Sequence, residues 1–593
     1  MRNTVKRHLR RSQAITTFGP GAIVDLREES VMMAGLDFWP KAPLVEIHEP
    51  NLEQALGVEG FRMPGTVDLS KDGKDLPIVI FPRWMACPIC HRLAPYDFFT
   101  AGLNAPGSFI RCTACKKRVY PARLIVACRH GHVDDFPWVE WLKRGDDPCQ
   151  CDKPALTLTS MGRTASLADL IVKCKTCGKY RTLSGATQPE KLKFLRCTGQ
   201  RPWLNDHEQC GEEVVPLQRG ASNVYFSLVT SSISIPPWSK SVHSLLNNYW
   251  STLKHIPELA LKPTIEGMNL PARLGLSSDD IVLAIIERRT GEKLDGEKLS
   301  EKQIRYSECL ALRRPQSGGN LQDDFKTEPI SVHKSLEGLI SKVVLVERLR
   351  EVRALIGFTR ISPPDPDPSS RFDITVAPIS RHRENWLPAI EVHGEGIYLE
   401  LSEDTYQSWI NRPGVQTRAS HLLESYQKMC ERRHWQPVRN ISPRLLLTHS
   451  FAHALIRQLS LESGYSSASI RERLYVFEPG EMDNDSGISG LLIYTSTPDS
   501  EGSLGGLVRQ GLPERLATTV KAAINEAVWC SSDPLCIESE GQGHDAMNLA
   551  ACHSCLLLSE TCCEEFNRLL DRAALIGTLT DPGVGFFNGL VEE

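Results

Sequence analysis

Four pairs of closely spaced cysteines are the residues of this chain best suited to chemistry. They are Cys87/Cys90, Cys112/Cys115, Cys174/Cys177 and Cys552/Cys555, each a C-x-x-C. Two intervening residues let one turn direct both thiolates at the same ion, so the spacing favours tetrahedral zinc coordination. A single pair would also suit redox chemistry, but four pairs with further cysteines nearby indicate zinc sites.

The two pairs nearest the N-terminus form the first predicted site. Cys90 and Cys112 are separated by 21 residues. Two such turns about twenty residues apart are typical of a four-cysteine zinc ribbon. The spacing therefore predicts one zinc ion held by Cys87, Cys90, Cys112 and Cys115.

A second site is predicted from the next cysteines along the chain, but its ligand set is less well defined. The predicted ligands are Cys174, Cys177, Cys197 and Cys210. Other thiol and imidazole groups compete for these positions, namely Cys128, His130, His132, Cys149, Cys151 and His207. The segment from Cys128 to Trp138 mixes thiol, imidazole and carboxylate groups. It is either a third metal site or a hydrogen-bonded turn that braces the ribbons.

A C-terminal site is predicted from Cys536, Cys552, Cys555 and Cys563, with Cys530 and Cys562 as spare thiols. Because adjacent residues point in different directions, only one of Cys562 and Cys563 is expected to bind the ion. The sequence thus predicts two to three structural Zn²⁺ sites. All-thiolate sites are closed and electron-rich, so they activate water poorly and stabilise folds instead.

No catalytic motif of the chain is complete. Residues 291–299 imitate a phosphate-binding P-loop, but Glu297 occupies the position of the essential lysine. We therefore expect no ATP hydrolysis by this chain alone. His449 and His453 would share a helix face at i, i+4, yet Ser450 stands where a zinc protease needs glutamate. Hydrogen bonding within an apolar helix is the preferred interpretation, and the alternative function is a metal-dependent nuclease or hydrolase that uses both histidines.

Composition places the chain among ordinary multidomain globular proteins. It has 593 residues, 41% hydrophobic and 24% charged, with a net charge of −4. This charge excludes a uniformly basic nucleic-acid binder but allows a local basic groove, and Lys/Arg lie near an aromatic residue in segments such as 116–120. The 19 cysteines in a long chain without an apolar signal segment, and without 18 consecutive apolar residues, predict a reduced, cytoplasmic protein.

The predicted fold class is α+β with several domains. We expect an N-terminal arm and β segment (1–75), a β-rich zinc-ribbon region (76–224), a mainly helical middle (225–360), a Pro-rich linker or loop (361–371) and a C-terminal α/β zinc-binding domain (372–593). Apolar residues recur at helical spacing over residues 335–356, which predicts a helix ended by Gly357.

Three further elements are predicted in the C-terminal domain. Residues 389–393 and 396–401 read as paired strands joined by a turn at Gly394 and Glu395. Residues 445–461 read as a buried helix, and residues 490–495 as an inner strand.

Several longer motifs resemble one known family. The segments SQAITTFGPG (12–21), FPRW (81–84), GHVDDFPW (131–138) and SMGRTASLAD (160–169) are similar to the DrmB family of the DISARM anti-phage defence system. The segments LTHSFAHALI (447–456), ACHSC (551–555) and ETCCEEFN (560–567) resemble the zinc-binding domain at the C-terminal end of MrfA-type helicases. The resemblance covers most of the chain and is weakest in its middle third.

The resemblance implies a non-catalytic, zinc-binding subunit of a helicase complex. In such systems a DrmA-like partner carries the superfamily-two ATPase motor, and the pair, a heterodimer, binds DNA with a single-stranded portion. The incomplete P-loop of this chain fits that division of labour. The register of the family pattern favours Cys563 over Cys562 as the fourth C-terminal ligand. A zinc-stabilised scaffold without DNA contact is the third alternative.

Overall fold

The computed structural model describes most of the chain. The described residues exclude 1–11, 27–28, 40–43, 65–75, 101–109, 145–146, 163–165, 236–248, 251, 275–277, 279–280, 283–284, 286–298, 314–323, 365–375, 434–439, 483–485, 496–504, 560–561 and 592–593. The basic N-terminal segment, nearly all of the P-loop-like segment and most of the Pro-rich linker therefore lie outside the described residues.

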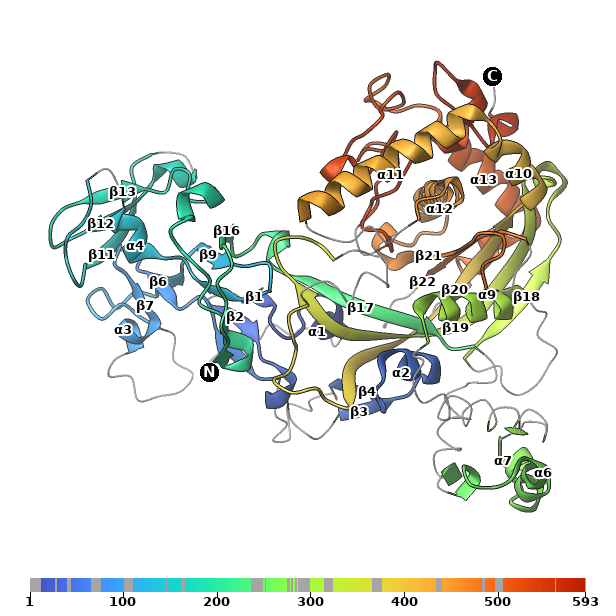
Figure 1. Ribbon diagram of the computed structural model, residues 1–593, viewed down its shortest axis with the longest axis horizontal. Coiled ribbons are helices and arrows are strands. Elements are labelled where there is room, and N and C mark those ends of the chain that lie inside the picture. Colours follow the sequence, from blue (N-terminus) through green and yellow to red (C-terminus); the bar gives the residue numbers. More distant parts are fainter. Residues whose placement is uncertain are drawn as a thin grey trace.

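The protein is an α+β molecule of several parts, as the sequence predicts. Figure 1 shows the N-terminal half, in blue and cyan, at one side, and the C-terminal part, in orange and red, at the other. The long strands β17, β19 and β20 run between them. The small helices α6 (Glu258–Gly267) and α7 (Leu270–Leu274) pack on each other around a core of their own.

The main sheet has eight strands and connects distant parts of the chain. Its path runs β17-β19-β20-β22-β21, with β18 paired to β19, β4 paired to β20 and β3 paired to β4. The strands are β3 (Leu44–Ile47), β4 (Gly60–Pro64), β17 (Phe226–Ile233), β18 (Lys326–Ile330), β19 (Ile340–Thr359), β20 (Trp386–Leu401), β21 (Ile470–Phe477) and β22 (Ile488–Thr495). All pairs are antiparallel except β4 with β20.

The helix predicted over residues 335–356 is wrong, because most of this segment is strand β19. The strand is rich in β-branched residues and is buried along most of its length. A strand buried on both faces gives a nearly continuous apolar run, in which helical spacing can also be found. The middle region is thus helical only in part, mainly at α6, α7 and α9 (Glu301–Arg313), and its other segments extend the sheet.

The paired strands predicted over residues 389–401 are one strand, β20. The Gly394 and Glu395 pair lies at a register shift opposite β19, where Leu349 faces Gly394 and Val346 faces Gly396. A Cβ atom at Gly394 would come within 1.8 Å of the Thr495 carbonyl oxygen. Glycine therefore permits close strand packing here rather than a chain reversal.

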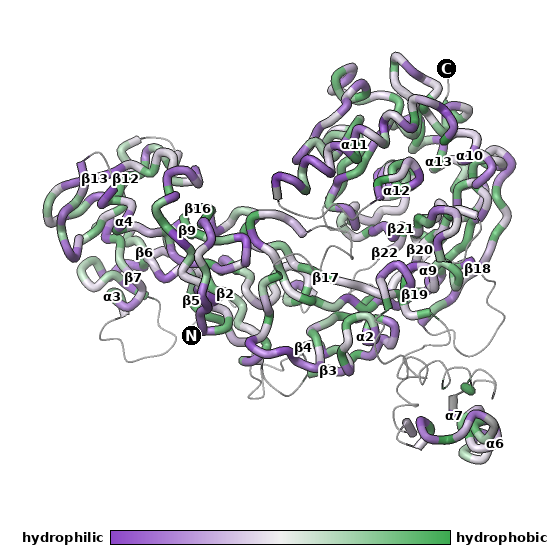
Figure 2. The backbone as a smooth tube through the Cα atoms, viewed as in Figure 1, coloured by the Kyte–Doolittle hydropathy of each residue, from purple (hydrophilic) through white to green (hydrophobic). Residues whose placement is uncertain are grey.

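Helices cover both faces of the sheet. Alternate residues of β20 and β22 enter two cores, so Ile397 and Leu491 pack with helix α12 (Pro443–Glu462), whereas Tyr398 and Leu492 pack on the side of α9. The predicted buried helix over residues 445–461 is confirmed as α12, and the predicted inner strand as β22, which lies between β20 and β21. In Figure 2 hydrophilic and hydrophobic residues alternate along α11 (Pro413–Arg433), which packs against α12.

The remaining helices of the C-terminal part are α10 (Glu403–Ile410), α13 (Pro513–Ala527) and α14 (Ala573–Ile576). Among the helices of the described residues, none is both long and apolar enough to cross a membrane.

The N-terminal half consists of small sheets separated by short helices. Its sheets are β1-β2-β5 (Ile23–Asp25, Ser30–Met33, Ile78–Ile80), β7-β6-β8 (Leu93–Pro95, Trp84–Ala86, Tyr120–Pro121), β10-β9-β16 (Val133–Asp135, Leu124–Ala127, Val215–Gln218), β11-β12-β13 (Leu156–Ser160, Leu170–Cys174, Tyr180–Thr182) and β14-β15 (Gln200–Arg201, Asp206–His207). Its helices are α1 (Gln13–Thr16), α2 (Pro50–Leu56), α3 (Tyr96–Thr100) and α4 (Trp138–Lys143).

A buried arginine joins this half to the main sheet. Arg360 follows β19 and donates hydrogen bonds to three backbone carbonyls, those of Gly21, Gly131 and Val224, at 2.8, 2.8 and 2.6 Å. Burial lowers the pKa of its guanidinium to about 9. Because these carbonyls come from three separate segments, Arg360 fixes the N-terminal turn and the β9–β10 loop against the sheet.

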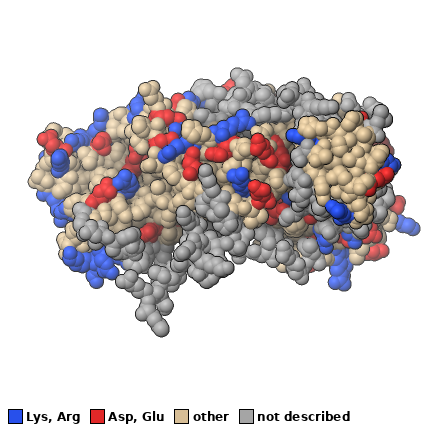
Figure 3. All heavy atoms as spheres, turned by 90° about the horizontal axis from the view of Figure 1, so that it is seen from below, with Lys and Arg blue, Asp and Glu red and all other residues tan. Residues whose placement is uncertain are grey.

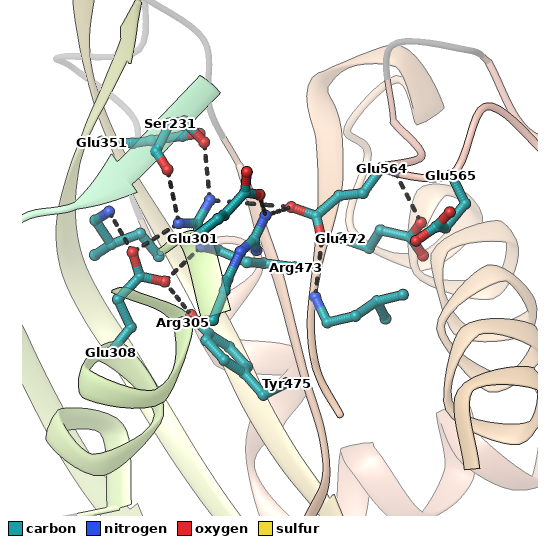
Figure 4. A network of polar contacts seen from close by, with 12 residues as sticks. Ser231, Glu301, Arg305, Glu308, Glu351, Glu472, Arg473, Tyr475, Glu564 and Glu565 are labelled. Carbon is teal, nitrogen blue, oxygen red and sulfur yellow. Dashed lines mark hydrogen bonds and ion pairs between the residues drawn. The ribbon is translucent and has the colours of Figure 1, made fainter. Parts of the chain in front are cut away.

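A second buried arginine fixes helix α9 to the sheet. Arg473 of β21 forms a bidentate ion pair with Glu308 of α9, with N–O distances of 2.6 and 2.7 Å, and both side chains are fully buried. Glu308 also accepts hydrogen bonds from the Tyr475 hydroxyl and the Ile233 backbone N–H. Figure 4 shows this network between α9 and the strands.

Removing one partner of this pair should be costly. Glu308→Gln removes the bidentate counter-ion of the buried Arg473 and leaves it Glu564 at 3.9 Å, so we expect the free energy of unfolding to fall by about 3–5 kcal/mol. Urea denaturation followed by tryptophan fluorescence measures it. Glu308→Gln combined with Arg473→Met should recover most of the loss, whereas Glu424→Gln, in an exposed pair, should change little. An unchanged midpoint in Glu308→Gln would contradict the role given to this pair.

Candidate metal centres

Four groups of cysteine-rich ligand atoms occur among the described residues. They are Cys87/Cys90/Cys112/Cys115, Cys128/His132/Cys197/Cys210, Cys149/Cys151/Cys174/Cys177 and Cys530/Cys536/Cys552/Cys555. Within each group, the four ligand atoms lie within 4.8 Å of one another. Four donors at this separation can surround one tetrahedral Zn²⁺ ion.

The first group has the membership that the sequence predicts. Its first turn follows β6 and its second turn precedes β8, and these two strands pair in one small sheet. The Cys87 N–H donates to the Arg92 carbonyl at 2.9 Å, and the Cys112 N–H donates to the Lys117 carbonyl at 2.7 Å. Lys116 has a φ of 60°, which closes the second turn. These backbone bonds direct both thiol pairs to one point.

The second predicted set is divided between two groups. Cys174 and Cys177 lie with Cys149 and Cys151, whereas Cys197 and Cys210 lie with Cys128 and His132. Strand pairing causes the division, because β12 pairs with β11 and sets Cys174 opposite Leu156, only a few residues after Cys151. The Cys177 and Cys149 sulfurs are 3.4 Å apart. The structure therefore does not bring together the predicted set of Cys174, Cys177, Cys197 and Cys210.

Two members of the next group, Cys128 and His132, lie in the loop between β9 and β10, and Cys197 and Cys210 join them from the segment before β16. His132 Nδ1 is 3.4 Å from the Cys128 sulfur and 3.6 Å from the Cys197 sulfur, while its Nε2 contacts Glu208 at 2.7 Å. The hydrogen bond with Cys197 and the neighbouring His132 lower the pKa of the Cys128 thiol to about 4. The group therefore favours a thiolate at Cys128. His130 and His207 belong to none of the ligand groups in the described residues.

The C-terminal group includes Cys530 in place of Cys563. Cys530 follows helix α13, and its sulfur is 3.5 Å from that of Cys552. The sulfurs of Cys536 and Cys555 are 3.8 Å apart. The sequence analysis gave Cys530 as a spare thiol, whereas the structure places it in the group.

Cys563 lies instead with His449, His453 and Glu472 in a fifth group, which is completely buried. Cys562 points elsewhere, and its thiol donates to the Ser467 carbonyl at 2.8 Å. The sequence analysis missed Glu472. Glu472 lies between Arg471 and Arg473 in strand β21, so its charge alone did not distinguish it from an ordinary ion-pairing residue.

Comparisons with known proteins show what this chain is similar to. Residues 10–226 match a family model described as a domain of unknown function (DUF8724), and residues 451–556 match the MrfA Zn-binding domain. The DISARM protein DrmB of Bacillus paralicheniformis is 34% identical over 585 residues, which cover 96% of this chain and all of the relative. The chain belongs to the DrmB family. It is thus a zinc-binding member of a defence-system family.

The prediction of structural zinc is confirmed for this DrmB-family chain, which carries several structural zinc sites. The cysteine-rich groups of the described residues number four, more than the two to three sites that the sequence predicts. The metal-ligand role of each individual residue remains a prediction, and the geometry above defines how to test it.

Zinc counts of paired variants separate the two groupings of the second set. Because Cys149 and Cys174 share one group, Cys149→Ser, Cys174→Ser and their combination should each lose one zinc ion per chain. Cys174→Ser combined with Cys197→Ser should lose two ions, since these thiols belong to different groups. Elemental analysis of the purified full chain by mass spectrometry measures the counts. A loss of only one ion in the Cys174/Cys197 double variant would instead support the grouping predicted from sequence.

Proposed function

We propose that this protein is a non-catalytic, zinc-binding subunit that partners a superfamily-two DNA helicase and helps it to engage DNA in bacterial anti-phage defence. The observation that carries the proposal is the match to a DISARM protein over the full length of the relative. The match to the MrfA Zn-binding domain supports a helicase-associated role for the C-terminal part. We place the protein in the cytoplasm, where its thiols stay reduced.

The chemistry of the cysteine-rich groups supports a structural role rather than catalysis. Three groups offer four thiols, and the fourth offers three thiols and one imidazole. Four such donors complete the tetrahedral coordination of a zinc ion and leave no position for a reactive water molecule. The partner's motor would therefore supply ATP hydrolysis, and this chain would supply binding surface.

The first zinc ribbon has the features of a nucleic-acid contact. Lys116 and Lys117 are exposed in its second turn. Tyr120 and Phe98 nearby in the same ribbon are 52% and 41% exposed. Ammonium groups neutralise phosphates, and exposed aromatic faces stack on unpaired bases, so this combination suits DNA with a single-stranded portion.

The charge of the whole molecule fits local rather than general binding. Figure 3 shows Lys and Arg side chains interspersed with Asp and Glu over the face that it displays. Lys and Arg also gather at the lower left of this view. With a net charge of −4, DNA binding would depend on such local groups and would be weak for the isolated chain.

Co-expression with the helicase encoded beside it tests the partnership. We expect a stoichiometric complex that survives size-exclusion chromatography and whose ATPase activity rises with forked DNA. Helicase alone and this chain alone are the controls. Failure to form a complex, with and without forked DNA, would exclude the proposed partnership.

A charge-reversal pair tests the DNA contact. Lys116→Glu with Lys117→Glu should lower the affinity of the complex for forked DNA about tenfold and reduce the salt slope by about 2. Fluorescence anisotropy over a salt series measures both values. Lys428→Glu with Arg432→Glu is the matched control, because these α11 side chains are 70% and 63% exposed and the change in charge is the same. Equal effects of the two double variants would contradict a contact by the ribbon.

A further inference from the structure

The fifth ligand group brings together side chains from three separate elements. His449 and His453 lie one turn apart on helix α12, Glu472 lies on strand β21, and Cys563 lies in the C-terminal segment. Their four ligand atoms lie within 4.8 Å of one another, and none of the four side chains is appreciably exposed. Polar groups gathered in a core need a compensating partner.

The short contacts of this group centre on one nitrogen atom. His449 Nε2 is 3.0 Å from His453 Nε2, 3.1 Å from a Glu472 carboxylate oxygen and 3.2 Å from the Cys563 sulfur. His453 Nε2 is 3.6 Å from the same Glu472 oxygen. The four donor atoms thus face a common point.

Backbone carbonyls determine which ring nitrogen of each histidine carries hydrogen. Nδ1 of His449 faces the Leu569 carbonyl at 3.2 Å, and Nδ1 of His453 faces the Leu556 carbonyl at 2.8 Å. A carbonyl only accepts, so both Nδ1 atoms donate, and in neutral rings both Nε2 atoms present lone pairs. Such outer hydrogen bonds orient metal-binding histidines in other proteins.

A proton alone satisfies this arrangement poorly. One hydrogen on His449 Nε2 could bond to only one of the three acceptors around it, namely His453 Nε2, Glu472 or the Cys563 sulfur. Among the described residues, the second carboxylate oxygen of Glu472 is buried and has no hydrogen-bond partner. A divalent cation at the common point would bind all four donors at once.

Cys563 has the backbone surroundings of the cysteines in the other groups. Its sulfur accepts hydrogen bonds from the N–H of Glu565 at 3.3 Å and of Asn567 at 3.2 Å. The bond from the residue two positions later recurs at Cys197, with Gly199 at 3.3 Å, and at Cys530, with Ser532 at 3.4 Å. Such donors stabilise a thiolate. The backbone N–H groups around Cys563 therefore favour a thiolate, as they do at Cys197 and Cys530.

We propose that His449, His453, Glu472 and Cys563 bind one Zn²⁺ ion, in a site distinct from the four-cysteine group of the same domain. Two imidazoles, one carboxylate and one thiolate are all ligands that Zn²⁺ accepts, and four of them complete its tetrahedron. The ion would fasten α12 to β21 and to the C-terminal segment. It needs no reactive water, so the role is structural.

The structure also provides an approach for the ion. Glu472 and Cys563 line a cleft of about 1670 Å³ beside the sheet. Figure 4 shows Glu472 and Arg473 pointing away from each other, so Glu472 lies apart from the Arg473–Glu308 pair and keeps its charge for the ion. The new site also touches the four-cysteine group, because the Leu556 carbonyl that holds His453 belongs to the residue after Cys555.

Adjacent cysteines supply a matched test. Cys563→Ser should bind one zinc ion fewer per chain than the wild type, and so should Glu472→Gln. Cys562→Ser, a change in an equally buried neighbour outside the group, should keep the full count. Elemental analysis of the full chain measures all three variants. Unchanged zinc content in a folded Cys563→Ser or Glu472→Gln protein would overturn the proposal.

A measurement on the wild-type protein decides the question if those variants fail to fold. X-ray absorption at the zinc edge gives the average number of imidazole ligands for each bound ion. With the new site, His132, His449 and His453 contribute three imidazoles to five ions, whereas without it His132 alone contributes one to four ions. The lower average, with four ions bound, would show that the buried group holds only protons.

Discussion

Convergence of thiolates on metal ions is the constraint on which the N-terminal half depends. Among the residues that the structure describes, the buried core of the first ribbon consists of Met85, Cys87, Ala94, Phe99, Ile110, Cys112 and Val119. Two of these are candidate ligand cysteines, so the candidate metal site is part of the core itself. A module of this size buries too little apolar surface to offset the conformational entropy lost on folding, and metal binding supplies the missing free energy.

The long strands of the main sheet connect the N-terminal half to the rest of the molecule. β19 and β20 extend from the C-terminal core to the N-terminal half, where Leu355, Phe358 and Ile390 pack with Trp203 in one shared cluster. Arg360 donates a hydrogen bond to the Gly131 carbonyl, next to the candidate ligand His132. The loop that carries candidate zinc ligands is therefore fastened directly to the main sheet.

Buried and partly buried charges connect the C-terminal segment to helix α9 and the sheet. Glu564, next to Cys563, binds Arg305 of α9 at 2.6 Å, and α9 is held to Arg473 through Glu308. The C-terminal segment thus contacts α9 and the fifth ligand group through neighbouring residues. Because an unpaired polar group in a core is costly, this region is specified by particular polar partners as well as by apolar packing.

The sequence by itself determined the local features of this protein. A C-x-x-C turn depends on a few neighbouring residues, so the first ribbon and the knuckle of Cys552 and Cys555 could be recognised directly. Helix α12 and strand β22 were predicted because long apolar runs with clear period or length are strong local signals. The family motifs, read in order, predicted the family that the full-length comparison then established.

Only the tertiary structure decided which turns share an ion. Pairing of β11 with β12 brings Cys149 and Cys151 to Cys174, and no local spacing encodes that register. β19 was mistaken for a helix because burial on both faces removes the alternation that marks a strand. Glu472 lies beside His449 and Cys563 because α12 packs against β21. Contacts of this kind arise from packing between segments distant in the sequence. The sequence therefore identifies the candidate ligand residues, and the tertiary structure determines which of them lie together.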